Sequence, residues 1–276
     1  MTTEELIAAR RAEPWREALR KSKKNKERTD IPRVEMNELD AEYRSHTRLE
    51  EVNLGLTKEQ AMQEAQRCLD CPNPTCMQGC PVSINIPTFV KNIERGEFLE
   101  AARVLKETSA LPAVCGRVCP QEKQCESKCI HLKMGKPAVA IGYLERFAAD
   151  YERESGNISV PEVAEKNGIK IAVVGSGPAG LSFAGDMAKR GYDVTVFEAL
   201  HEIGGVLKYG IPEFRLPNKI VDVEIEGLRK MGVKFMTNCI VGKTISYDDL
   251  HADGFKGIFA ASGAGLPNFM NIPGEN

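Results

Sequence analysis

The 276-residue sequence has no apolar run approaching the ~18 residues that a membrane-spanning helix needs. It also lacks a surplus of charge of either sign: the formal net charge is −2, which gives no global argument for binding to nucleic acid or to a membrane. The N-terminus, residues 1–5, is acidic and has no apolar segment typical of a secretory signal, so we expect none. A composition of 42% hydrophobic and 28% charged residues is ordinary for a globular protein of about two domains.

Cysteine, by contrast, is plentiful, and the nine cysteines are not scattered. All but Cys239 fall into two runs of four: Cys68, Cys71, Cys76 and Cys80, then Cys115, Cys119, Cys125 and Cys129. Thiolates at such short spacings can converge on one inorganic centre. An odd number of cysteines grouped as metal ligands fits a reducing cytoplasm better than a disulfide scaffold, so we expect a cytoplasmic protein.

The first run reads C-x2-C-x4-C-x3-C-P, close to the C-x2-C-x2-C-x3-C-P pattern of ferredoxin-type [4Fe–4S] sites. Zinc is the main alternative, because paired C-x2-C units are its usual signature. Only Cys68 and Cys71 form such a pair, and both runs contain a Cys-Pro step. The pattern therefore favours iron–sulfur clusters over zinc, disulfides or free thiols.

In ferredoxin-type runs the fourth cysteine binds the other cluster. On this hypothesis Cys68, Cys71 and Cys76 hold three corners of a first cluster, and Cys80 turns away to a second. If Cys129 returns to the first cluster, the second is held by Cys80, Cys119, Cys125 and one further ligand. Cys115 and Glu145 are the candidates for that ligand.

The order of elements predicts a helical domain. We take residues 1–35 as a charged N-terminal extension, 36–155 as the helical domain and 156–168 as a linker. The basic run 20–28 has no interleaved aromatic residues, which favours a solvated helix face or tail over a nucleic-acid site. No strand in 36–155 is convincing, and the expected helices are 38–51, 57–69 (with a capping box at Thr57), 87–96, 97–106 and 137–151.

The pattern changes at residue 169, where a β-branched strand, 169–174, leads into a G-x-G-x-x-G loop. A helix from Pro178 to Arg190, a strand over 193–197 and the acidic Glu198 follow, which completes a dinucleotide-binding fingerprint. The predicted binding residues are Gly175, Ser176, Gly177, Pro178, Ala179, Gly180 and Glu198. Gly175 permits the tight turn, Gly177 lets the pyrophosphate approach the backbone, Gly180 allows close helix–strand packing, and Glu198 accepts hydrogen bonds from a ribose.

Two segments carry a family resemblance. Residues 64–71 (EAQRCLDC) and 111–120 (LPAVCGRVCP) resemble the N-terminal iron–sulfur domain of the glutamate synthase small subunit. The same domain occurs in dihydropyrimidine dehydrogenase and in the large subunit of NADH-dependent ferredoxin:NADP oxidoreductase. The resemblance implies two [4Fe–4S] clusters with crossed ligation and one Glu or Gln ligand on a following helix. Glu145 falls at that place, so the resemblance favours Glu145 over Cys115.

Residues 201–207, 210–217 and 258–264 resemble the FAD domain of the same family. By this resemblance the further cofactor-binding residues are Gly204, Gly205, Leu207, Arg215, Leu216, Gly263 and Ala264. The implied fold is α + α/β: an all-α iron–sulfur domain followed, over 169–276, by a Rossmann-like FAD-binding parallel sheet that is incomplete at its C-terminus. Family members continue into a separate NAD(P)H-binding domain, so we expect a part of a longer protein, or a subunit whose partner supplies the rest.

The function implied is oxidation of NAD(P)H by FAD, with electrons passed through the two clusters to a partner. That partner is the glutamate synthase large subunit or, in the alternative, a ferredoxin or other electron-transfer subunit of a ferredoxin:NADP oxidoreductase. Dihydropyrimidine dehydrogenase itself is disfavoured, because no pyrimidine domain is present. Two alternatives of another class are a non-enzymatic electron carrier and a zinc-stabilised interaction module.

Overall fold

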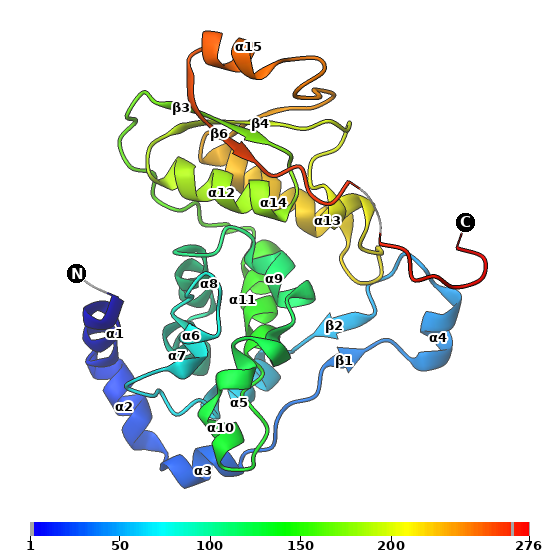
Figure 1. Cartoon of the computed structure of the whole chain (residues 1–276). Helices are drawn as coiled ribbons and strands as arrows, with labels where there is room; N and C mark the ends of the chain where they lie inside the picture. Colours follow the sequence, from blue (N-terminus) through cyan, green and yellow to red (C-terminus); the bar gives the residue numbers. More distant parts are fainter. Residues whose placement is uncertain (1–2, 266–267, 276) are drawn as a thin grey trace. The chain divides into compact units, whose positions relative to one another are not determined.

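The computed structural model describes residues 3–265 and 268–275 (Figure 1). These form two compact units. The first, here called the helical unit, comprises the described residues up to Pro161 together with Ile211–Glu224. The second, called the Rossmann unit, comprises Glu162–Gly210 and the described residues from Ile225 onward.

The helical unit is built mainly from short helices joined by tight turns. Its elements up to residue 161 are α1 (Thr3–Arg11), α2 (Pro14–Ser22), α3 (Asn25–Asp30), β1 (Asn37–Glu38), α4 (Ala41–His46), β2 (Asn53–Gly55), α5 (Lys58–Gln66), α6 (Thr75–Gln78), α7 (Ile86–Glu94), α8 (Phe98–Lys106), α9 (Pro112–Val118), the 3-10 turns η1 (Gln121–Lys123) and η2 (Glu126–Lys128), α10 (Ile130–Lys133) and α11 (Ile141–Ser155).

The apolar faces of α5, α7, α8 and α11 meet in one core. At its centre Phe98 packs edge-on against Phe147 and Tyr151, with ring centroids 5.0 and 4.9 Å apart. Cys125 and Cys129 belong to the same cluster of buried side chains, and Cys68, Cys76 and Cys80 pack against it. Members of both cysteine runs are therefore attached to the packed core of the unit.

Most of the expected helices of this unit are present within a few residues of their predicted bounds. The capping box is confirmed, because Gln60 donates its backbone N–H to Thr57 Oγ1 at 3.2 Å and accepts that of Thr57 at 2.9 Å. The helix expected over 38–51 is wrong: only α4 forms there, and β1 pairs with β2 in an antiparallel ribbon. Asp40 accepts the first N–H groups of α4 and so starts that helix late, while Leu39 donates to the carbonyl of Val52 across the ribbon.

The N-terminal segment is not the solvated tail that its charges suggested. Its helices α1–α3 belong to the helical unit, and Arg16 and Arg28 are each only 1% exposed. Helical periodicity alone could not reveal this, because the buried partners of these arginines are carboxylates much further along the chain. Other members of the run stay outside, and the Lys21 side chain is 75% exposed.

The Rossmann unit contains the predicted parallel sheet, with strand order β5-β4-β3-β6. Its elements are β3 (Lys170–Val174), α12 (Pro178–Lys189), β4 (Asp193–Phe197), α13 (Val206–Tyr209), β5 (Lys234–Met236), α15 (Tyr247–Ala252) and β6 (Phe255–Ala260), while α14 (Asn218–Lys230) begins in the helical unit's second segment. All three strand pairings are parallel, and β3 lies between β4 and β6. The loop after β3 therefore opens at the carboxyl edge of the sheet, where dinucleotides bind in this architecture.

Residues 211–224 are grouped with the helical unit, although the sequence had placed them in the FAD-binding domain. The backbone N–H of Val52 donates to the carbonyl of Phe214, which ties this segment to the end of the β1–β2 ribbon. Across the described ranges, no helix has both the length and the apolarity that a bilayer crossing demands.

Candidate metal centres and dinucleotide site

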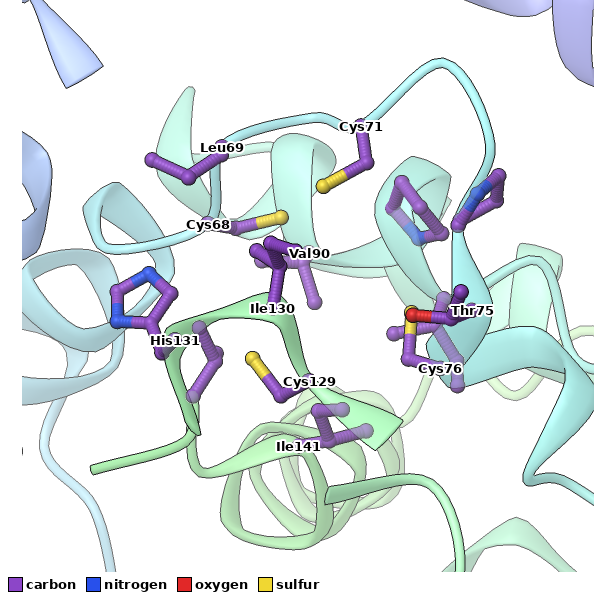
Figure 2. A pocket seen from close by; sticks show the side chains of 14 residues that line it. Cys68, Leu69, Cys71, Thr75, Cys76, Val90, Cys129, Ile130, His131 and Ile141 are labelled. Atoms are coloured by element: carbon purple, nitrogen blue, oxygen red, sulfur yellow. The ribbon is translucent and has the colours of Figure 1, made fainter. Parts of the chain in front are cut away.

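Four cysteines from two distant segments line one cavity in the helical unit (Figure 2). Cys68 and Cys71 lie in the turn that follows α5, and Cys76 lies in α6. Cys129 stands directly before α10, so the later run supplies the fourth thiol. The structure thus brings together the set that crossed ligation assigns to the first cluster. Their role as ligands remains a prediction.

The walls between these thiols are almost entirely apolar, and include Ile86, Pro87, Val90, Val139 and Ile141. Burial raises the pKa of the Cys68 thiol to about 11, and it raises the pKa of Cys71 and Cys76 as well. Thiolates are the metal-ligating form, so these groups require a metal or another positive charge in order to ionise. The donor set and its dry surroundings fit an iron–sulfur cluster.

A second set comprises Cys80, which follows α6, Cys119 at the end of α9, Cys125 directly before η2, and Glu145 in α11. The pKa of Cys119 is raised to about 11, first by burial and then by the charges of Glu145 and Cys80. Burial also raises the pKa of Cys125, followed by the charges of Glu126, Glu145, Cys80 and Cys119. Glu145 and Cys80 therefore contribute to the pKa shifts of both Cys119 and Cys125. The members of this set are the four residues assigned to the second cluster, an assignment that also remains a prediction.

The placement of Glu145 depends on a close approach of two helices. A Cβ atom built at Gly116 of α9 would lie only 2.5 Å from the backbone nitrogen of Arg146 in α11. The next residue of α11 to the N-terminal side, Glu145, is 5% exposed, and its Oε1 has no hydrogen-bond partner among the described residues. Burial, followed by the charge of Glu224, raises the pKa of Glu145 to about 8. A buried, unpartnered carboxylate oxygen is costly unless something absent from the protein chain binds it.

The alternative ligand, Cys115, lies in α9 near the same groups. Burial is the largest cause that raises its pKa, followed by the charge of Glu145, while a hydrogen bond with the Ser109 side chain opposes the rise. Cys115 therefore has a protein partner, whereas Glu145 Oε1 has none. The orphaned oxygen of Glu145 is open to a ligand, and the choice of Glu145 over Cys115, which the resemblance implies, remains a prediction.

The spacing of the thiols bears on the choice of metal. All nine cysteines are free thiols. Within the described parts of the chain, no three His, Cys, Asp or Glu side chains converge closely enough to hold a single metal ion. The four thiols of the first set surround a cavity, and the metal that they bind remains a prediction.

The glycine loop of the Rossmann unit has the geometry that a dinucleotide needs. Gly175 has φ +101°, and a Cβ there would lie 2.4 Å from the carbonyl oxygen of Ala261. A Cβ at Gly180 would lie 2.1 Å from the carbonyl oxygen of Gly175, so helix α12 and the loop touch at this point. At Gly177 a Cβ would meet no atom within 4 Å, which leaves the backbone open to a ligand.

Glu198 lies beside this loop, as predicted, but it already has partners. Its Oε2 accepts hydrogen bonds from the Ser176 backbone N–H, at 2.8 Å, and from the Ser176 hydroxyl. Its Oε1 accepts the N–H of Leu200 at 2.9 Å. The carboxylate thus fixes the loop, and its contact with a ribose remains a prediction. Pro178 and Ala179 form the first turn of α12, directly after Gly177.

The glycine pair after β4 also reaches the loop. Gly204 donates its N–H to Ser176 Oγ at 3.0 Å, and a Cβ at Gly205 would lie 2.9 Å from the Gly177 Cα. Leu207 is buried in α13 at 2% exposure. The structure therefore brings Gly204 and Gly205 against the phosphate loop, as a shared role in cofactor binding requires.

The remaining residues predicted to contact the cofactor belong to two different units. Gly263 and Ala264 follow β6, and the backbone N–H of Ala261 bonds to the carbonyl of Val174 at the end of β3, so they leave the sheet beside the loop. Arg215 and Leu216 belong to the segment grouped with the helical unit, where Leu216 is fully buried. Their part in binding the cofactor remains a prediction.

Two buried acids were missed by sequence reasoning. Asp70 lies in the segment that carries the family resemblance, but the sequence gives it no role of its own, although its side chain is 0% exposed. Glu224 accepts the N–H of Ala113 at 2.6 Å, at the first turn of α9, and burial raises its pKa to about 7. Nothing in the sequence marks Glu224, because its partner lies more than 100 residues away.

Comparison with known proteins supports both halves of this description. Residues 44–157 match the family described as dihydropyrimidine dehydrogenase domain II, 4Fe-4S cluster, and residues 173–231 match the NAD(P)-binding Rossmann-like domain. The chain is 39% identical over 224 residues, 80% of its length and 54% of the relative's, to the NAD-dependent dihydropyrimidine dehydrogenase subunit PreT of Escherichia coli K12.

Two glutamate synthase [NADPH] small chains are similarly related. The one from Escherichia coli K12 is 40% identical over 70% of this chain and 41% of its own length. The one from Azospirillum brasilense is 33% identical over 82% of this chain and 46% of its own length. The chain therefore spans about half the length of the curated relatives it matches. The resemblance carried by the cysteine and glycine motifs is confirmed, and the chain belongs to the iron–sulfur oxidoreductase family that includes the glutamate synthase small chains and the PreT subunits.

Proposed function

We propose that this chain is the iron–sulfur and dinucleotide-binding part of an NAD(P)H-dependent flavoprotein of the glutamate synthase small-chain type. It holds two [4Fe–4S] clusters and FAD, and it delivers electrons to a partner subunit. When bound, FAD would accept a hydride and release its electrons singly, and the clusters would conduct them. The cytoplasm is the natural compartment, because the eight proposed ligands include seven free thiols.

The observation that carries the proposal is the convergence of Cys129 with Cys68, Cys71 and Cys76 around one apolar cavity. If the cysteines bound zinc as isolated pairs, we would not expect Cys129, the last cysteine of the second run, to lie beside the first run. The unpartnered oxygen of Glu145 supports the second centre, because without a ligand no hydrogen bond compensates for the burial of that oxygen.

The chain's own residues have separable roles in this proposal. The apolar walls of the first cavity exclude water, which together with hydrogen bonds to sulfur sets a cluster's potential. Gly177 and the N-terminal turn of α12 would receive the pyrophosphate of FAD, and Glu198 would hold both the loop and the ribose. Gly204 and Gly205 would close the other side of the phosphate site.

A PreT-type role is the second candidate. The identity to PreT, 39% over 80% of the chain, equals that to the glutamate synthase small chain of the same organism within one per cent and extends over more of the chain. The two roles differ in the partner subunit and the final acceptor. A ferredoxin:NADP oxidoreductase role differs in the same way.

The test is anaerobic reconstitution followed by iron, sulfide and flavin analysis and an absorption spectrum. We expect about eight irons per chain and two reduced-state resonances by electron paramagnetic resonance. Iron near four per chain with one resonance would contradict the two-cluster proposal. A colourless, zinc-containing protein would indicate the interaction module instead, and clusters without FAD binding would indicate an electron carrier. Identification of the subunit that co-purifies then separates the glutamate synthase, PreT and ferredoxin roles.

A further inference from the structure

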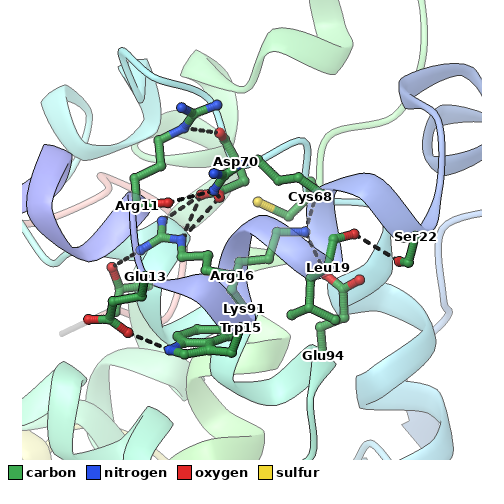
Figure 3. Close-up of polar contacts among 12 residues, drawn as sticks. Arg11, Glu13, Trp15, Arg16, Leu19, Ser22, Cys68, Asp70, Lys91 and Glu94 are labelled. Carbon is green, nitrogen blue, oxygen red and sulfur yellow. Dashed lines mark hydrogen bonds and ion pairs between the residues drawn. The ribbon is translucent and has the colours of Figure 1, made fainter.

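The turn between Cys68 and Cys71 is held by the N-terminal helices (Figure 3). Asp70, in the middle of this turn, has φ +52° and a fully buried side chain. Arg16 of α2 forks around its carboxylate, with Nε 3.0 Å from both oxygens, and Arg20 contributes Nη1 at 2.7 Å from Oδ2. A left-handed conformation at a non-glycine residue persists only where its surroundings fix it, and these two arginines do so.

The backbone of the same turn is also held by cations. Arg11 of α1 donates Nε–H to the carbonyl of Asp70 at 2.9 Å, and Lys91 of α7 donates to the carbonyl of Cys68 at 2.6 Å. Arg28 of α3 donates to the carbonyl of Gln66, just before the turn, at 2.7 Å. All three of the N-terminal helices thus reach the segment that carries the first two thiols.

The ion pairs at this turn carry more positive than negative charge. Asp70 is shared by Arg16 and Arg20, and Glu94 is shared by Arg28 and Lys91. These four cations and two carboxylates carry a surplus of two positive charges, most of it buried. A buried charge surplus is costly unless a counter-charge lies close by. The adjoining cavity is lined by four thiols, and a cluster ligated by four thiolates is an anion.

We propose that Asp70, Arg16 and Arg20 are positioning residues for the first cluster, and that the N-terminal helices form part of its site. This rests on the proposed function, because it presumes the cluster at Cys68, Cys71, Cys76 and Cys129. The helices lie outside the family match, which begins at residue 44. They set the conformation of the Cys68–Cys71 turn and the positive potential beside the cluster.

Removing the positive and the negative member of this site should shift the reduction potential of the first cluster in opposite directions. A purely structural contact would not produce such opposite shifts. One-electron reduction makes the cluster more negative, so nearby positive charge raises its reduction potential. Arg20→Gln removes a positive charge and should lower the potential of the first cluster. Asp70→Asn removes a negative charge of similar shape and should raise it. The second cluster should keep its potential in both variants.

The experiment is a potentiometric titration of the reconstituted full chain, followed by electron paramagnetic resonance. Arg103→Gln is the matched control, because Arg103 pairs with Glu100 on the exposed face of α8. Shifts of opposite sign confined to the first cluster would support the proposal, as would selective loss of that cluster in Arg16→Gln. Unchanged potentials in both charge variants, or equal shifts in the control, would overturn it.

A wild-type protein without two clusters would instead overturn the proposed function, so the two failures are distinguishable. If Asp70→Asn fails to fold, the shift in Arg20→Gln decides alone, since that side chain is 21% exposed and less disruptive to remove.

Discussion

Gly116 and Arg146 bring α9 and α11 into backbone contact: a Cβ at Gly116 would lie 2.5 Å from the Arg146 nitrogen and 2.6 Å from its Cα. Both atoms belong to backbone, so neither can move aside by changing rotamer. The contact holds Cys119, at the end of α9, beside the carboxylate that precedes Arg146. The second proposed cluster site therefore depends on a residue without a side chain.

Gly116→Ala should lower the free energy of unfolding by ~1–3 kcal/mol, because overpacking against backbone forces the helices apart. It should also reduce the iron held at the second site while leaving the first. Urea denaturation and iron analysis measure the two effects. Gly227→Ala is the matched control, because a Cβ at Gly227 of α14 meets nothing within 4 Å. There the same substitution should be neutral or stabilise by up to ~1 kcal/mol through helix propensity. A Gly116→Ala protein as stable as the wild type would contradict the close-contact argument.

Crossed ligation predicts that Cys129→Ser damages the cluster of the first cysteine run. The four thiols share one cavity, so loss of one corner should cost that cluster and lower iron from about eight to about four per chain. Cys239→Ser, at the one cysteine outside both runs, should leave the iron content unchanged. If Cys129→Ser removed the resonance that Cys119→Ser and Cys125→Ser also remove, ligation would not be crossed.

The eighth ligand can be assigned by comparing Glu145→Ala with Cys115→Ser. Carboxylate oxygen is a harder ligand than thiolate, so its removal should weaken iron binding or alter the resonance of one cluster. Cys115→Ser should leave both clusters intact, because its thiol has Ser109 as a partner. The reverse pattern would move the assignment to Cys115.

The cluster-free protein should lose stability as pH rises from about 5 to about 8. Glu145 and Glu224 have folded-state pKa values raised to about 8 and about 7, from an ordinary value of 4.5. Each binds its proton more tightly when folded, so its stabilisation is complete below the unfolded pKa and is lost as pH rises through the folded pKa. Each group contributes a slope of up to ~1.4 kcal/mol per pH unit between its two pKa values.

Glu145→Gln should flatten that decline, and the two variants Glu145→Gln and Glu224→Gln should differ in the pH range affected, up to about 8 and about 7. Denaturant titrations of the cluster-free proteins between pH 5 and 8 measure this. A Glu145→Gln protein whose stability falls with pH as steeply as that of the wild type would show that Glu145 is not buried in the cluster-free protein.

The sequence predicted best those parts of the fold where local chemistry determines structure. The strand over 193–197, the loop at Gly175–Gly180 and the capping box at Thr57 follow from residue types at short range. The cysteine spacing even suggested that Cys129 would join the first run, since ferredoxin-type patterns carry that rule with them.

The predictions were incomplete where contacts between residues far apart in the sequence determine the structure. Arg28 looked like part of a solvated run and Arg16 like part of a charged extension, because nothing nearby in sequence reveals their carboxylate partners Glu94 and Asp70. The ribbon of β1 and β2 has strands of two and three residues, too short for periodicity to show. Residues 211–224 pack with the helical unit because of tertiary contacts such as that between Val52 and Phe214.

Two glycines of one loop provide a matched test of the dinucleotide site. Gly177→Ala adds a methyl group that touches no protein atom, and Gly177 already has φ −66° and ψ 178°, which alanine adopts freely. Its stability should therefore equal that of the wild type, whereas FAD affinity should fall about tenfold or more, which is ~1.4 kcal/mol, because the methyl group occupies the approach of the pyrophosphate. Gly180→Ala places its methyl 2.1 Å from the Gly175 carbonyl oxygen and should lower the free energy of unfolding by ~1–3 kcal/mol. Denaturation curves and a fluorescence titration with FAD are measured for each variant and compared with those of the wild type. Undiminished FAD affinity in Gly177→Ala would mean that no phosphate approaches the backbone there, and the loop would then be a structural turn between β3 and α12.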